Sequence, residues 1–179
     1  MPARDSVYID VIADTKKAVA NMAKFAAGVA AAVVALKAVT KAVGEMVNAY
    51  GIQERAEMKL AAAIKATGRE GTISTLALKE LASELQQVTT FGDEVTLSAM
   101  AMLQQLGDLN EKGLKQVTPA VQDFAAAMDV DLQTAATLVG KTLGSSTNAL
   151  SRYGIQIDAT APKSEKLAQL TEELNKKFG

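Results

Sequence analysis

The sequence contains no cysteine, no histidine and no tryptophan. Without cysteine there is no disulfide and no thiolate nucleophile. Without cysteine and histidine the usual ligands of structural zinc are missing. The commonest acid–base catalyst, an imidazole, is missing as well. A hydrolase would need a serine–lysine or N-terminal threonine arrangement, and no segment marks one. We therefore expect that the protein is not an enzyme and has no catalytic residue, metal or cofactor.

Proline and aromatic residues are scarce, with 3 prolines and 4% aromatics among 179 residues, whereas hydrophobic residues make up 49%. Much of that share is alanine, which together with leucine, lysine, glutamate and glutamine favours helix. The sequence therefore predicts an all-α fold. Its formal net charge of −1 supplies no bulk positive field, so we expect no specific nucleic-acid partner.

The clearest pattern is a seven-residue repeat between Thr15 and Tyr50, whose positions are lettered a to g. Large apolar side chains fall at a and d, and position e is mostly apolar too, which makes the stripe wider than a two-stranded seam. Lysines and one glutamate fall at b, c or f. We expect three or more copies to associate through one long helix, at an interface formed by Met22, Phe25, Val29, Val33, Leu36, Val39, Val43, Met46 and Tyr50.

The repeat fails after Tyr50, because Gln53, Glu54 and Glu57 would occupy apolar positions. Gly51 either ends or bends the helix, so a continuous helix and a helical hairpin both remain open. A second amphipathic stretch follows and ends at Gly68, a plausible left-handed C-terminal residue. Before the repeat, residues 6–13 have β-branched side chains and predict a short extended or poorly defined lead.

Beyond Thr72 the pattern indicates short helices separated by caps. We expect Asp93 to cap a helix that Gly107 stops, Thr118-Pro119 to start or bend the next, and Asp131 to cap another. Gly154 followed by Ile155 fits a left-handed cap, and a last helix should follow Pro162. The expected organisation is a long helix or hairpin over residues 1–68 and a compact bundle over 69–179, together one structural unit truncated at its C-terminus.

Motifs with chemical meaning have simpler structural explanations. Gly140-Lys141-Thr142 resembles the end of a phosphate-binding loop, but Ala135 stands where that loop requires glycine. Asp129 and Asp131 lack the following oxygen donors that a calcium loop needs, so a helix cap is favoured. The acidic pairs Glu54/Glu57 and Glu172/Glu173 lie among basic residues on expected helices, where solvated faces are the ordinary explanation.

The segment FAAGVAAAVVAL, residues 25–36, is the candidate for contact with a membrane. It is uncharged but short of the roughly 20 residues that span hydrocarbon. A buried helix or an oligomer seam is favoured. A membrane-active helical protein, with a pore-forming or DNA-ejection role, remains the alternative, and an adaptor or chaperone-like binding module also stays open.

A resemblance to a known family covers most of the chain and is best from about Ile52 to Gly179. The run TTFGDEV, then LQQLGDL, VTPAVQDFAAAMDVDLQTAATLVGKTL and LSRYGI resembles the helical region of phage tail tape measure proteins. The opening YIDVIADTKKA is similar to the start of many members. The matching residues are Thr89, Phe91, Glu94, Val95, Gly107, Phe124, Ala125, Ala126, Asp131, Leu132, Ala135, Ala136, Gly154 and Ile155.

This resemblance implies a structural coiled-coil protein of a phage or prophage tail. Several copies would lie in the lumen of the tail tube, set the tail length during virion assembly and leave during DNA ejection. The implied partners are the tail tube protein and tail assembly chaperones, with a membrane possible during ejection. Synthesis would take place in the cytoplasm of the bacterial host. Because 179 residues reach at most about 270 Å even as one helix, a fragment of a longer ruler is expected.

Overall fold

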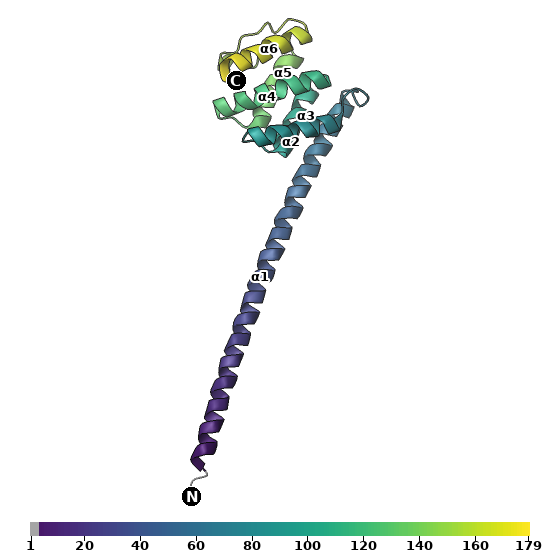
Figure 1. Cartoon of the computed structure of the whole chain (residues 1–179). Helices are drawn as coiled ribbons and strands as arrows, with labels where there is room; N and C mark the ends of the chain where they lie inside the picture. Colours follow the sequence, from purple (N-terminus) through teal and green to yellow (C-terminus); the bar gives the residue numbers. More distant parts are fainter. Residues whose placement is uncertain (1–3) are drawn as a thin grey trace. The chain divides into compact units, whose positions relative to one another are not determined.

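The computed structural model describes the backbone of residues 4–179 and the side chains of residues 15–179. Every regular element in this range is helical, which confirms the all-α prediction of one long helix followed by shorter ones (Figure 1). The elements are α1 (Arg4–Ala66), α2 (Thr75–Val88), α3 (Asp93–Gly107), α4 (Glu111–Met128), α5 (Leu132–Gly144), the 3-10 helix η1 (Ser151–Tyr153) and α6 (Lys163–Phe178).

Helix α1 is continuous over 63 residues, a length of about 95 Å at the usual helical rise. It runs through Gly51 without a break, so the hairpin alternative is wrong. A Cβ added at Gly51 would meet only the Arg55 side chain, at 3.6 Å. Residues 6–13 belong to the same helix, so the extended lead is wrong as well: the helix-forming sequence that follows outweighs the local β-branched residues.

The contacts within the chain divide it into two units, with the boundary between Ala49 and Tyr50. The last four turns of α1 therefore belong to the second unit. There Ala56, Leu60, Ala63 and Ile64 are buried in the core of the bundle. Gly68 follows the last residue of α1 by two positions and has a left-handed φ of 69°, as the sequence predicted for the end of this amphipathic stretch.

The core of the second unit forms where α3 packs against α5 and α4 packs against α6 (Figure 1). Phe124 of α4 lies at its centre, with its ring 5.2 Å from that of Tyr153 and 5.5 Å from that of Phe178. The crossing of α3 and α5 depends on glycine. A Cβ at Gly144 would stand 1.9 Å from the carbonyl oxygen of Leu106, so no larger residue fits there without moving a helix.

Several helix ends agree with the sequence. Asp131 caps α5 and accepts a hydrogen bond from the Thr134 amide at 2.8 Å. Gly154 has a φ of 75°, and Ile155 behind it is fully buried. Helix α3 ends at Gly107, although the residue with positive φ is the next one, Asp108.

Two other helix ends differ from expectation. Gly92, not Asp93, is the N-cap of α3, and Asp93 is the first helical residue. Pro119 lies inside α4, which starts eight residues earlier behind the cap Asn110. A proline inside a helix leaves the carbonyl four residues back without its amide partner. The complete burial of Val117, Ala120 and Val121 supplies the apolar contacts that hold α4 helical on both sides of it.

Two buried glutamines connect the helices of the bundle. Gln104 of α3 donates to the Thr67 hydroxyl at 2.7 Å, and Gln122 of α4 donates to the Thr96 hydroxyl at 2.9 Å. Each threonine hydroxyl in turn donates to a backbone carbonyl. The side-chain oxygens of both glutamines have no hydrogen-bond partner among the described residues, so each contact is satisfied on the donor side alone.

Candidate self-association surface

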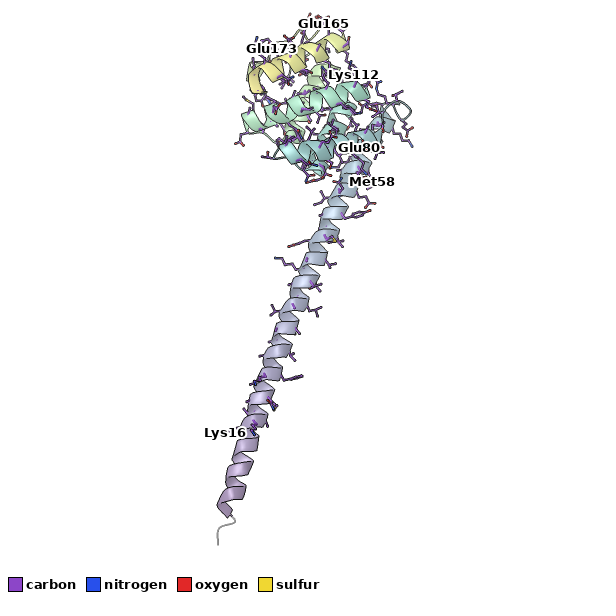
Figure 2. All side chains as sticks on the ribbon, in the orientation of Figure 1. Lys16, Met58, Glu80, Lys112, Glu165 and Glu173 are labelled. Carbon is purple, nitrogen blue, oxygen red and sulfur yellow. The ribbon has the colours of Figure 1, made fainter. Side chains whose placement is uncertain are left out.

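The predicted interface residues all lie on the exposed surface of α1. From Thr15 to Tyr50 every side chain is exposed, and the nine predicted residues range from 47% exposed at Val29 to 75% at Phe25. In Figure 2 the side chains of this part of α1, which begins near the labelled Lys16, stand out from the ribbon. We call these nine exposed residues the seam.

The sequence around the seam favours helix even though the side chains of residues 16–50 are exposed. Alanine fills half of the positions between the seam residues, and no proline interrupts the run, which gives a high intrinsic helix propensity. Two glycines oppose it. A Cβ added at Gly28 or Gly44 would meet nothing within 4 Å, so neither glycine is required by a close contact within the chain, and each costs about 1 kcal/mol relative to alanine.

The charges of this region lie away from the seam. Five lysines and one glutamate occur between Thr15 and Tyr50, all at positions b, c or f of the repeat. Lys41 and Glu45 are 3.8 Å apart, and both side chains are largely exposed. An exposed ion pair contributes little to the free energy of folding. The main effect of these two charges is to keep the outer face of α1 hydrated.

The seam stops where α1 enters the bundle. Gln53 and Glu57 occupy the next d and a positions, and both are engaged within the second unit. Gln53 donates to the Asp93 carboxylate at 3.0 Å, and Glu57 is 2.8 Å from the Lys79 ammonium. The following d and a residues, Leu60 and Ile64, are buried by the bundle itself. The apolar positions open to a partner therefore end at Tyr50.

One stretch of the helix is apolar on every face. Residues 25–36 contain no charged or strongly polar side chain, and even position f holds Val34, which is 67% exposed. Within Thr15–Ala66, a window of 18 residues reaches a mean hydropathy of 1.8, enough by length and composition to cross a membrane. Core helices of soluble proteins and N-terminal signal sequences have the same length and hydropathy.

The bundle does not assemble the other candidate motifs into a chemical site. Gly140-Lys141-Thr142 lies within α5, where the Thr142 hydroxyl donates to the Leu138 carbonyl and accepts from the Ala149 amide. Asp131 is used as a helix cap. Among residues 15–179, no three acidic, histidine or cysteine side chains gather as metal ligands would.

The two acidic pairs lie beside lysines. Besides the contact of Glu57 with Lys79, the Glu173 carboxylate is 3.7 Å from the Lys177 ammonium. Glu54 and Glu172 are exposed, and Figure 2 shows Glu173 on the surface helix α6. Each pair therefore belongs to a hydrated helix face, as the sequence suggested.

A groove of about 420 Å³ lies between the last turns of α1 and the helices α3 and α5. Its walls are mostly small or uncharged, with Ala62, Ala66, Ser98 and Met102 along the two longer helices. Lys59 is the charged residue in its lining. This composition suits packing and offers no acid–base pair.

A cluster of charges missed by the sequence reasoning fixes the end of α3. Arg69 donates to the Asp108 carboxylate at 2.6 Å, and the Lys163 ammonium is 3.0 Å from the other oxygen. The Arg69 hydrogen bond, assisted by Lys163, lowers the pKa of Asp108 below its ordinary value of 3.8. These residues are 39 and 55 positions from Asp108, so no local pattern could have joined them.

Comparison with known protein families, with curated proteins and with solved structures finds no match.

Proposed function

We propose that this chain is a structural protein that self-associates through the seam, as part of the helical ruler of a phage or prophage tail. The observation that carries the proposal is one continuous helix whose large apolar side chains repeat every seven residues and are exposed from Met22 to Tyr50. The resemblance of the chain, best from about Ile52 to Gly179, to tape measure proteins supports the tail assignment.

The size of the exposed seam supports association. Nine large side chains that are half to three-quarters exposed present on the order of 1,000 Å² of apolar surface. The largest apolar patch on an ordinary monomer is about 300–600 Å², and a standard interface buries about 800 Å² on each partner. The exposed seam is therefore comparable in size to one side of a standard interface, which supports association.

Light scattering on the full chain tests the self-association. We expect a mass of at least three 18.7 kDa protomers. The combined changes Val29→Gln, Leu36→Gln and Val43→Gln should give the monomer, because they place amides at three a positions. The matched control is Ala23→Gln, Ala30→Gln and Ala38→Gln, which adds the same amides at b and c and should leave the mass unchanged. A wild-type monomer at every soluble concentration would overturn the proposal.

The genomic neighbourhood tests the tail assignment separately. Genes for a tail tube protein, a tape-measure chaperone and baseplate proteins beside this one would support it. A neighbourhood without tail genes would remove the ruler and leave a self-associating helical protein of another kind.

A membrane-active protein is the second candidate, favoured by the apolar stretch over residues 25–36. Flotation with neutral and anionic vesicles distinguishes it from the first candidate. Val34→Lys puts a charge at position f, outside the seam, so it should abolish membrane binding and leave the scattering mass unchanged. Wild-type chain that never floats with vesicles would eliminate this candidate.

A further inference from the structure

The two edges of the seam differ in size. Position e on one edge holds Val19, Ala26, Val33, Thr40 and Val47, which are mostly β-branched. Position g on the other edge holds Asn21, Gly28, Ala35, Ala42 and Ala49, which are small apart from the asparagine. A helix with one large and one small edge does not fit every orientation of its partner equally well.

Coiled-coil geometry determines which edges meet. In a parallel pair of helices in register, the g residue of one helix lies beside the e residue five positions later on its neighbour. The pairs would then include Gly28 with Val33, Ala35 with Thr40, and Ala42 with Val47, each a small residue against a β-branched one, whereas the first pair is Asn21 with Ala26. An antiparallel pair instead places e against e and g against g, so that one side is crowded and the other is underfilled.

We infer that the partner of the seam is the same helix of further copies, parallel and in register, with the e edge of each copy against the g edge of the next. The inference rests on the proposed self-association and specifies its geometry. Contact between unlike edges is heterologous, and a closed ring of such contacts relates all copies by rotation about one axis. Three or more helices related in this way are necessarily parallel.

Thr40 and the lysines, which lie beside the seam, are compatible with this packing. The Thr40 hydroxyl already donates to the Lys37 carbonyl at 3.0 Å, so burying it against Ala35 leaves no donor unsatisfied. The open space around Gly28 leaves room for Val33 of the neighbour. The lysines at b, c and f remain in solvent in either orientation, so side-chain size and not charge selects the parallel one.

Single cysteines test the orientation, because the chain has none of its own. We would make Met22→Cys, Leu36→Cys and Tyr50→Cys, one at each end and one in the middle of the seam, and oxidise each full-length variant. Equivalent a residues of parallel helices lie within disulfide reach, so each variant should form its own cross-linked dimer. Ala23→Cys, at the outer position b, should not.

An antiparallel assembly gives a different set of products. Only Leu36→Cys would cross-link with itself, and a mixture of the Met22→Cys and Tyr50→Cys proteins would yield the mixed dimer. That result would overturn the parallel arrangement and leave self-association intact. A chain that stays monomeric in light scattering, with none of the seam cysteines cross-linking, would overturn both.

Exchanging the sizes of the Ala42 and Val47 side chains tests the contact between the two edges independently, through the strength of association. Ala42→Val alone should weaken association by at least several-fold, because it crowds the neighbouring Val47. Adding Val47→Ala restores the pair with its sizes exchanged, and we expect association to recover at least in part. If the two changes instead weaken association additively, Ala42 and Val47 do not meet, and the e-to-g contact is wrong.

Discussion

Asp108 shows how one residue can end a helix and connect distant parts of the bundle. Its backbone has the left-handed φ of 46°, which aspartate and asparagine tolerate better than most residues. Its carboxylate meets Arg69 from the turn after α1 and Lys163 from the start of α6. The residue therefore serves as both a C-cap and an electrostatic junction.

We expect Asp108→Asn to lower the free energy of unfolding at neutral pH by about 1 kcal/mol or less, since the side chain is 45% exposed and solvent screens its ion pairs. Asparagine keeps the left-handed backbone, removes the charge, and replaces one of the two acceptor oxygens that face Arg69 and Lys163 by an amide donor. The folded-state pKa of Asp108 is lowered, so its contribution is present above the ordinary value and is lost as pH falls through the folded-state pKa.

Urea unfolding of both proteins over a series of pH values measures this difference. The difference between wild type and variant should be constant near neutrality and should disappear as the pH falls below 3.8, the ordinary pKa of the group. A difference that persists unchanged into strong acid would show that the charge of Asp108 is not what stabilises the junction.

Residue-scale prediction succeeded where the chemistry is local. Gly68, Gly154 and Asp131 were placed correctly because each acts on backbone groups within a few positions. The contacts of Gln104 with Thr67 and of Gln122 with Thr96 span 37 and 26 positions. They depend on which helices are neighbours, and spacing along a single sequence does not contain that information.

At the scale of the element, α6 is attached to the ends of other helices by its lysines. Lys166 is buried and donates to the carbonyl of Ser145, the C-cap of α5, at 2.7 Å. Lys163 reaches the Asp108 carbonyl, and Lys177 reaches that of Gly154, the C-cap of η1. A cation near a helix C-terminus is favourable because the last carbonyls carry partial negative charge.

Lys166→Met should therefore destabilise the bundle by about 1–3 kcal/mol, because it keeps most of the buried aliphatic chain but leaves the Ser145 carbonyl without its charged donor. Lys176→Met, at an exposed position of the same helix, is the matched control and should change stability by less than about 0.5 kcal/mol. Chemical denaturation followed by circular dichroism compares them. Equal losses in the two variants would contradict a specific role for Lys166.

The sequence predicted that the chain is helical. The wrong predictions concern helix ends, where the preference of one residue is outweighed by the residues around it. Pro119 marks a helix start by its own chemistry, yet α4 runs through it because the residues on both sides are buried. Gly51 was compatible with a helix end, yet α1 continues because the residues on either side favour helix and no contact requires a turn there. The intrinsic preference of a residue predicts its structure poorly where the burial of apolar side chains contributes several kcal/mol in the opposite direction.

At the scale of the whole molecule, helix formation and association should be coupled. The side chains of residues 16–50 are exposed, and Gly28 and Gly44 weaken the isolated helix. Each helix gains stability from its partners, so the helical content of the protein should depend on its concentration.

Circular dichroism at decreasing concentration tests this coupling. We expect the helical signal of the wild type to fall to a lower plateau over the range in which its scattering mass falls, while the bundle keeps its own helices. Gly44→Ala, at the outer position b, should raise that plateau without altering the interface. A mass that falls while the helical signal stays constant would mean that the isolated helix is already fully formed.

The continuity of α1 also has a consequence for insertions and deletions. Seven added residues lengthen a helix by about 10.5 Å and rotate its faces by only about 20°, so duplicating residues 36–42 would extend the seam and preserve its order. Three or five added residues would instead rotate the later part of the stripe away from the earlier part. The length of this helix can therefore change in whole repeats, while its surface chemistry stays the same.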